Sequence, residues 1–165
     1  MKSFTDTYNN LWICTETNIF MTSPYINQFE HYAYHGDPTK GISNKYVRTI
    51  CEDYNGNLWS GTLEGVSIIN RNTNTFEHIR IKEKNFDSNE TSRSVFYLLK
   101  GKGNVIWAGS IAAGLVKINS RDYSYKCFLP DETDPHSITN FCVYQLHKDK
   151  EGNIWAGTWG GGLNK

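Results

Sequence analysis

Short apolar runs separated by polar, glycine-bearing turns dominate the chain. One run, Val47-Arg-Thr-Ile-Cys-Glu-Asp53, is followed by Asn55-Gly56 and then by Leu58-Trp-Ser-Gly-Thr62. Asn-Gly is the preferred pair for a tight type I′ hairpin, because both central residues need positive φ. Segments rich in Val, Ile, Thr and aromatic residues on both sides of such a turn predict two antiparallel strands. We name them strand A (47–53) and strand B (58–62).

Two further segments complete a four-stranded unit. Gly65-Val-Ser-Ile-Ile-Asn70 predicts strand C, and Thr75-Phe-Glu-His-Ile79 predicts strand D. Four consecutive strands of this kind form one blade of a β-propeller. The main alternative is a helical solenoid, for which residues 92–100 could supply a helix. The equivalent segments are rich in strand formers, and the Asn-Gly turn follows them too soon for a helical hairpin.

The unit recurs about every 48 residues. The tryptophans of strand B are separated by 47, 48 and 48 residues, and they are Trp12, Trp59, Trp107 and Trp155. The glycines two residues later are Gly61, Gly109 and Gly157, with Cys14 in the first copy. The aspartates six residues before the tryptophan are Asp6, Asp53 and Asp149, with Gly101 in the third copy. Identity in register at several positions indicates a repeat architecture. A strand glycine in register also predicts close approach of a neighbouring backbone, and we expect an aromatic ring of the next blade as its contact.

The repeat predicts an all-β fold, a partial β-propeller of about 3.5 four-stranded blades in one domain, 1–165. The expected blades span approximately 1–43, 44–91, 92–139 and 140–165, with the first beginning inside strand A and the last ending in strand C. We expect a fragment of a seven-bladed propeller. An open blade face that exposes several hundred Å² of apolar surface forgoes about 10 kcal/mol of burial. We therefore expect self-association through the open blade faces, and two copies of 3.5 blades would hold seven.

Composition narrows the classes of partner. The chain has 17 basic and 17 acidic residues, so its charge predicts neither nucleic-acid binding nor membrane contact by this segment. The longest apolar run, 95–99, is far shorter than a membrane span, and no signal peptide is evident. The four cysteines form no CxxC pair, so we expect small buried side chains, with no metal and no cofactor. They are Cys14, Cys51, Cys127 and Cys142.

The pattern of residues from Val47 to Val66, Val-x-x-Ile-x-x-Asp-x-x-Gly-x-Leu-Trp-x-Gly-Thr-x-x-Gly-Val, resembles the two-component regulator propeller repeat. The resemblance covers nearly the whole chain in four copies. It departs from the pattern at Gly101, Cys14 and Ser110. The resemblance implies the sensor region of hybrid two-component histidine kinases of Bacteroidetes. There, two seven-bladed propellers outside the inner membrane sense carbohydrate and signal to a cytoplasmic kinase, which implies a periplasmic location here.

Candidate ligand-binding residues fall in the loops that share one face of a propeller, the B-to-C and D-to-A connections. Trp159 is the tryptophan out of register, and an exposed ring there could stack on a sugar, or could instead cover the next blade's edge. Arg48 and Arg93, near the ends of two A strands, could bind an acidic sugar or be ordinary surface arginines. Glu64 and His136 complete the candidate set.

A partial calcium-loop pattern runs from Asp53. Asp53, Asn55, Asn57 and Glu64 match its first, third, fifth and twelfth positions, but Leu58 replaces the glycine that the turn demands. A hairpin turn explains this stretch better than a metal site.

The sequence favours a non-catalytic sensor segment that binds an oligosaccharide and shifts a conformational or dimer equilibrium. One alternative is a propeller enzyme, a lyase or glycosidase, which would need carboxylates or histidines from several blades at the axis. Another is a scaffold that binds protein partners. The inward positions of strand A are mostly apolar or hydroxylated, which argues against catalysis.

Overall fold

The computed structural model describes residues 2–15, 18–23, 26–82 and 94–165, and this part of the chain is all β, with fifteen strands and no helix. The strands form three four-stranded antiparallel sheets and one three-stranded sheet, in chain order. We name these sheets blades 1 to 4. The predicted all-β partial propeller is confirmed. No helix in the described residues is long and apolar enough to cross a membrane.

The blades have the following strands. Blade 1 contains β1 (Lys2–Thr5), β2 (Leu11–Cys14), β3 (Ile19–Ser23) and β4 (Ile26–Tyr32). Blade 2 contains β5 (Val47–Glu52), β6 (Leu58–Thr62), β7 (Gly65–Asn70) and β8 (Thr75–Ile79). Blade 3 contains β9 (Val95–Lys100), β10 (Val105–Ser110), β11 (Leu115–Asn119) and β12 (Tyr125–Phe128). Blade 4 contains β13 (Val143–Lys148), β14 (Ile154–Thr158) and β15 (Gly162–Asn164).

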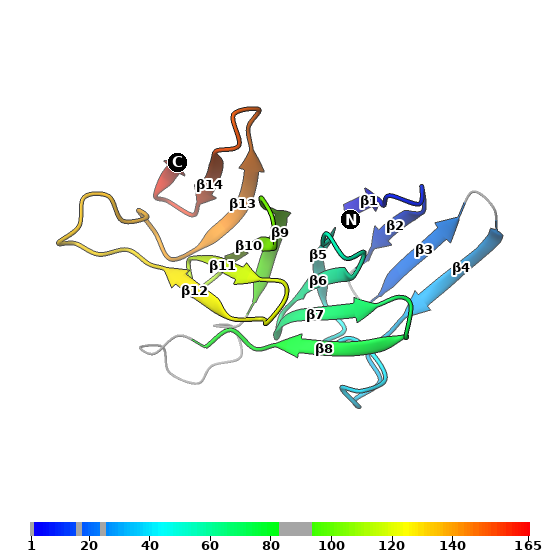
Figure 1. The fold of residues 1–165 in the computed structure, drawn as a ribbon. Helices are drawn as coiled ribbons and strands as arrows, with labels where there is room; N and C mark the ends of the chain where they lie inside the picture. The colour runs from blue at the N-terminus through cyan, green and yellow to red at the C-terminus, as the bar shows by residue number, and fades with distance from the viewer. Residues whose placement is uncertain (1, 16–17, 24–25, 83–93) are drawn as a thin grey trace.

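The blades follow one another as a fan around their innermost strands (Figure 1). Strand β5 contacts β1 on one side and β9 on the other, and β9 in turn contacts β13. Strands β4, β8 and β12 lie at the outer rim (Figure 1). The connections from A to B and from C to D therefore lie at one end of the sheets, and the B-to-C connections lie at the opposite end.

Apolar clusters fill the spaces between neighbouring blades. Trp12 faces blade 2 in one cluster, and Trp59 faces blade 3 in the next; both side chains are fully buried. A third cluster joins blades 3 and 4, with Trp107 half-buried at its margin. Trp155, on the outward face of blade 4, is also half-buried. Trp12, Trp59 and Trp107 thus each pack on the blade that follows their own.

The register glycines allow the inner strand of the next blade to approach closely. A Cβ added at Gly61 would lie 2.8 Å from Cγ1 of Val95, and one added at Gly109 would lie 2.9 Å from Cγ1 of Val143. The expected close approach is present, but its partner is a valine rather than an aromatic ring. A Cβ at Gly157 would meet only Gln145, at 3.7 Å. Gly61 and Gly109 are needed because the valine of the following blade occupies part of the space that a side chain would fill. At Gly61, Cγ2 of Thr49 in the same blade lies even nearer, 2.5 Å from the added Cβ.

The cysteines form no disulfide in the described part of the chain, and Cys14, Cys51 and Cys142 are buried. Burial raises the pKa of the Cys51 thiol. Three of the four cysteines are therefore the small buried side chains that the sequence predicts, while Cys127 is partly exposed.

Candidate ligand-binding site

The register aspartates hold both the A-to-B turn and the tryptophan. Asp53 accepts the backbone N–H of Asn55 at 2.8 Å and that of Asn57 at 3.0 Å. Its other oxygen accepts the indole N–H of Trp59 at 2.9 Å. The carboxylate of Asp53 thus accepts hydrogen bonds within the predicted hairpin. Within the described ranges, no group of three or more His, Cys, Asp or Glu side chains could hold a metal ion.

The same indole–carboxylate bond recurs in blades 1 and 4. Trp12 donates to Asp6 at 2.9 Å, and Trp155 donates to Asp149 at 2.8 Å. The bond from Trp155 is the main reason why the pKa of Asp149 falls to about 2. The six-residue spacing between aspartate and tryptophan is evident in the sequence, but the aspartate was predicted only as a turn residue. The constant separation from the tryptophan was the signal that the two side chains interact.

Arg71 joins blades 1 and 2 through a buried ion-pair cluster. Its guanidinium bridges the carboxylates of Asp6 and Glu52, and its Nε donates to the carbonyl of Gly56 at 2.9 Å. Burial alone would raise the pKa of Asp6, but hydrogen bonds from Trp12 and other neighbours, including Arg71, outweigh it and hold that pKa at about 2. Asp6 is therefore ionised at neutral pH, and both carboxylates are ion-paired with Arg71.

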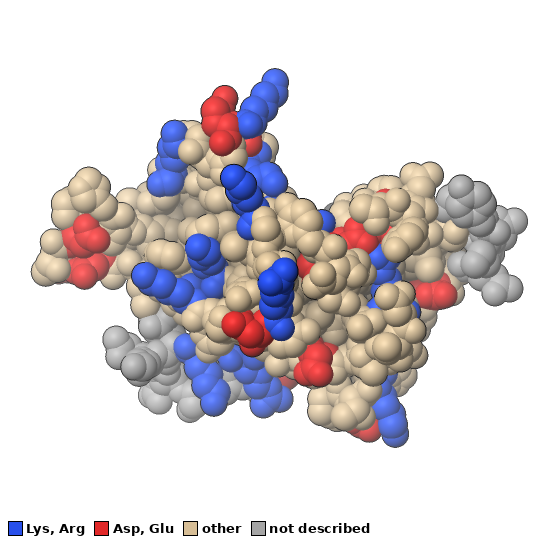
Figure 2. Space-filling view, viewed as in Figure 1, with Lys and Arg blue, Asp and Glu red and all other residues tan. Residues whose placement is uncertain are grey.

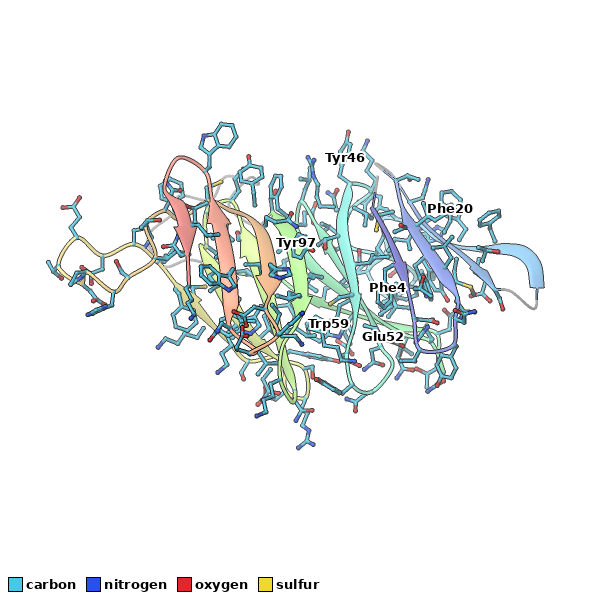
Figure 3. All side chains as sticks on the ribbon, turned by 90° about the horizontal axis from the view of Figure 1, so that it is seen from above. Phe4, Phe20, Tyr46, Glu52, Trp59 and Tyr97 are labelled. Atoms are coloured by element: carbon cyan, nitrogen blue, oxygen red, sulfur yellow. The ribbon has the colours of Figure 1, made fainter. Side chains whose placement is uncertain are left out.

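The same cluster borders the inner cavity of the fan. This cavity, of about 480 Å³, is lined by the inner strands β1, β5 and β9 and the turn that follows β1. Figure 3 shows Phe4, Glu52 and Tyr97 on these three successive inner strands. The carboxylates that line the cavity are those of Asp6 and Glu52, and each is ion-paired with Arg71. A paired carboxylate is a poor general base, so this cavity has no evident acid–base pair.

A second group of side chains lies at the opposite end of the inner strands. The register shifts beside Arg48, Phe96 and Tyr144, because β5, β9 and β13 each have a β-bulge near their first residues. A bulge leaves one residue unpaired and redirects its side chain. These three residues are 48 positions apart, so the bulge repeats with the blade.

The bulged side chains form a continuous ladder with Trp159. The guanidinium carbon of Arg48 lies 5.0 Å from the centre of the Phe96 ring, and Phe96 lies 4.7 Å from Tyr144. Tyr144 lies 5.5 Å from Trp159, with the rings tilted by 38°. We name these four residues the aromatic ladder. Trp159 is 70% exposed, and its backbone N–H donates to the carbonyl of Cys142.

The ladder spans three blades at the end where Tyr46 precedes β5, whereas Glu52 lies toward the other end of that strand (Figure 3). Arg48 and Trp159 were predicted from the sequence as ligand-binding residues, but Phe96 and Tyr144 were not. The 48-residue period identifies both as equivalents of Arg48, so the signal was present. The contacts between them became visible only once the blades were placed side by side.

Two segments, residues 41–64 and 137–160, match the family described as Two component regulator propeller. Each segment covers the end of the connection from the preceding blade and the first two strands of its own blade, which is blade 2 for the first segment and blade 4 for the second. These two segments of the chain therefore match the two-component regulator propeller repeat. No curated protein matches the chain.

Solved structures with the same fold come from two-component regulators and from other systems. The extracellular domain of the hybrid two component system BT3049 from B. thetaiotaomicron has a TM-score of 0.70 at 24% identity, over 98% of this chain and 19% of that one. The corresponding domain of BT4673 from the same organism gives 0.75 at 18% identity, over 95% and 22%. PorZ of Porphyromonas gingivalis, a surface component of the type-IX secretion system, gives 0.57 at 17%, over 99% and 31%. The chain thus spans about a fifth of the length of the two regulator domains.

Two other predicted site residues, Glu64 and His136, make their hydrogen bonds and ion pairs with residues outside the ladder. Glu64 accepts a hydrogen bond from the side chain of Asn44 at 3.1 Å and lies 3.8 Å from Arg80. The backbone N–H of His136 donates to Asp134 at 2.9 Å, and its residue is exposed. Arg93 lies outside the described residues. The ligand-binding role of these residues stays a prediction.

Proposed function

We propose that this chain is a non-catalytic sensor segment of a two-component signalling protein, and that it binds carbohydrate on the aromatic ladder. The family match supports the signalling context. The extracellular placement named for the BT3049 and BT4673 domains supports a location outside the inner membrane, in the periplasm or beyond. Ligand binding at this end of the blades would favour one conformation or assembly of the parent protein over another.

The ladder is the observation that supports a sugar ligand. An aromatic ring offers a large apolar face at small entropic cost, and the apolar face of a pyranose can pack against it. The exposed ring of Trp159 is continuous with Tyr144 and Phe96, which together provide a path for more than one sugar residue. Arg48 places a cation at the end of that path, which favours an acidic sugar there.

The distribution of carboxylates supports binding without catalysis. Glycoside hydrolysis needs a free pair of carboxylates on either side of the scissile bond. In the inner cavity, Asp6 and Glu52 are both paired with Arg71. The ladder itself contains no carboxylate.

Binding of neutral and acidic oligosaccharides, measured by calorimetry and by shifts in melting temperature, tests the proposal. We expect Trp159→Ala to weaken binding about tenfold, since a stacked ring contributes on the order of 1 kcal/mol. Tyr34→Ala is the matched control, because Tyr34 is 50% exposed and lies in the connection from blade 1 to blade 2, outside the ladder. Arg48→Gln should weaken only the acidic ligands.

The proposal is wrong if no oligosaccharide shifts the melting temperature of the wild-type chain. It is equally wrong about the site if a sugar binds and Trp159→Ala and Tyr34→Ala leave the same affinity. Release of reducing ends from any of the sugars would contradict the non-catalytic assignment.

A further inference from the structure

Blade 3 carries an excess of positive charge that the whole chain does not. Between residues 94 and 129 the acidic residue is Asp122, and the basic residues are Lys100, Lys102, Lys117, Arg121 and Lys126. Blade 2, from residue 47 to 82, is balanced, with Arg48, Arg71, Arg80 and Lys82 against Glu52, Asp53, Glu64 and Glu77. The net charge of the chain is zero, so the excess is a local property of blade 3.

Two of these cations face each other directly. Lys117 on β11 and Lys126 on β12 are register partners, and both side chains are exposed. Like charges directly opposite on neighbouring strands are destabilising. The equivalent pairs are Ile68 with Glu77 in blade 2 and Met21 with Glu30 in blade 1. Blade 3 therefore places two like charges where blades 1 and 2 pair a glutamate with an apolar residue.

No carboxylate of the described chain forms an ion pair with Lys117, Arg121 or Lys126. Asp122 lies beside Arg121 in the sequence, but it is used by its own turn and accepts the N–H of Ser124 at 3.0 Å and the hydroxyl at 2.7 Å. Among the described residues, these three cations therefore have no carboxylate partner.

These cations line an open groove of about 540 Å³ at the outer part of blade 3. Polar side chains beside them are Asn104, Ser124 and Tyr125. The blue side chains of this region gather over β11 and β12 in Figure 2. Trp107 and Phe128 lie behind the lysines, with Nζ of Lys117 5.8 Å from the first ring and Nζ of Lys126 5.0 Å from the second.

We propose that this groove binds an anionic polysaccharide, with Lys117, Arg121 and Lys126 pairing its sulfate or carboxylate groups and the amide and hydroxyl side chains pairing its hydroxyls. The groove lies at the end of the blades that carries the A-to-B and C-to-D turns, so it is separate from the aromatic ladder. A nucleic-acid ligand is disfavoured, because nucleic-acid-binding domains usually have a strong net positive charge, whereas this chain has none.

Fluorescence anisotropy with labelled dextran sulfate, and with neutral dextran of the same length, tests the assignment. We expect dextran sulfate to bind and dextran not to bind. The triple variant Lys117→Gln/Arg121→Gln/Lys126→Gln should bind dextran sulfate at least tenfold more weakly, with a shallower dependence of affinity on salt. The matched control removes three other exposed cations, as Lys40→Gln/Lys45→Gln/Lys150→Gln.

A single variant keeps the test valid if the triple variant is poorly folded. Lys126→Glu replaces the like-charged pair with an opposite-charged pair, as cross-strand neighbours prefer. We expect it to raise the melting temperature while it lowers affinity for dextran sulfate, and Lys150→Glu, with the same change in charge, to do neither.

Three results would overturn the proposal. One is the absence of dextran sulfate binding by the wild-type chain at 50 mM salt. Another is an equal loss of affinity in the control triple variant, which would indicate attraction by net charge rather than a site. The third is equally tight binding of duplex DNA with the same sensitivity to Lys126→Glu, which would assign the groove to nucleic acid. Loss of sugar binding at Trp159 leaves all three results unchanged, so the two proposals fail separately.

Discussion

Blades 2 and 3 share one topology and one apolar pattern, but they use charge in opposite ways. In blade 2, Asp53 accepts the indole N–H of Trp59, and Glu52 and Arg71 lie in the interface with blade 1. We call such an interface between neighbouring blades a joint. At the same repeat positions, blade 3 has Gly101, Lys100 and Ser120. Among the described residues, blade 3 forms no ion pair in its joint with blade 2, and Lys117, Arg121 and Lys126 are exposed outside it.

The joints show what replaces the ion pairs. Lys100 reaches back to blade 2, where its Nζ donates to the carbonyl of Asp53 at 3.0 Å and lies 4.1 Å from the ring of Tyr54. Lys148 makes the equivalent bond to the carbonyl of Lys100 at 3.3 Å. A cation at this inner-strand position can therefore close a joint without any carboxylate. Apolar packing defines the blade, while the polar chemistry of each joint is free to vary.

The largest expected difference between the blades is in their tryptophans. Trp59 is fully buried and donates to Asp53, so Trp59→Ala should lower the free energy of unfolding by about 3–5 kcal/mol. Trp107 is half-buried and has no acceptor among the described residues, so Trp107→Ala should cost about half as much. Urea denaturation followed by circular dichroism measures both. Equal losses of unfolding free energy in the two variants would show that neither the bond to the aspartate nor the deeper burial of Trp59 contributes to stability.

The joint between blades 1 and 2 should respond to acid. The pKa of Asp6 is about 2 in the folded chain and near 3.8 when unfolded, so its ionisation stabilises the fold above pH 4 and is lost as the pH falls toward 2. A shift of this size corresponds to about 2 kcal/mol. The difference in unfolding free energy between wild type and Asp6→Asn should therefore be present at pH 6 and disappear by pH 2.

Blade 3 supplies the control for this acid response. Hydrogen bonds from Ser124 lower the pKa of Asp122, but this carboxylate is exposed to solvent. Asp122→Asn should accordingly change the pH profile much less than Asp6→Asn. An identical pH dependence for the two variants would remove the special role assigned to the Arg71 cluster.

The smallest effect concerns the aspartate that blade 3 lacks. A Cβ at Gly101 would lie 3.0 Å from Nε1 of Trp107 and 3.0 Å from Cγ1 of Val105, so any side chain must displace these neighbours slightly. Gly101→Ala carries only the free-energy cost of this displacement, whereas Gly101→Asp also supplies an acceptor for the indole N–H of Trp107. We expect the aspartate variant to be more stable than the alanine variant by about 1 kcal/mol, as measured by thermal unfolding. The reverse order would show that blade 3 cannot form the indole–carboxylate bond.

The sequence period was sufficient to predict the strands, their order and the number of sheets. Val47–Glu52, Leu58–Thr62, Gly65–Asn70 and Thr75–Ile79 were each predicted to within a residue. These features depend on local turn chemistry and on apolar residues that repeat every 48 positions. Only half of the aromatic ladder was predictable from the sequence. Trp159 stands out because it does not follow the 48-residue spacing of the other tryptophans, whereas Phe96 and Tyr144 resemble ordinary strand residues.

What the sequence by itself determined was the blade and its repetition. What only the tertiary structure decided was which side chains from different blades meet: Arg71 with Asp6, Gly61 with Val95, and Arg48 with Phe96. The physical reason is that blades are joined by side-chain packing rather than by backbone pairing. The backbone ladder follows from local pattern, but contacts between blades depend on how each sheet twists and stacks on the next.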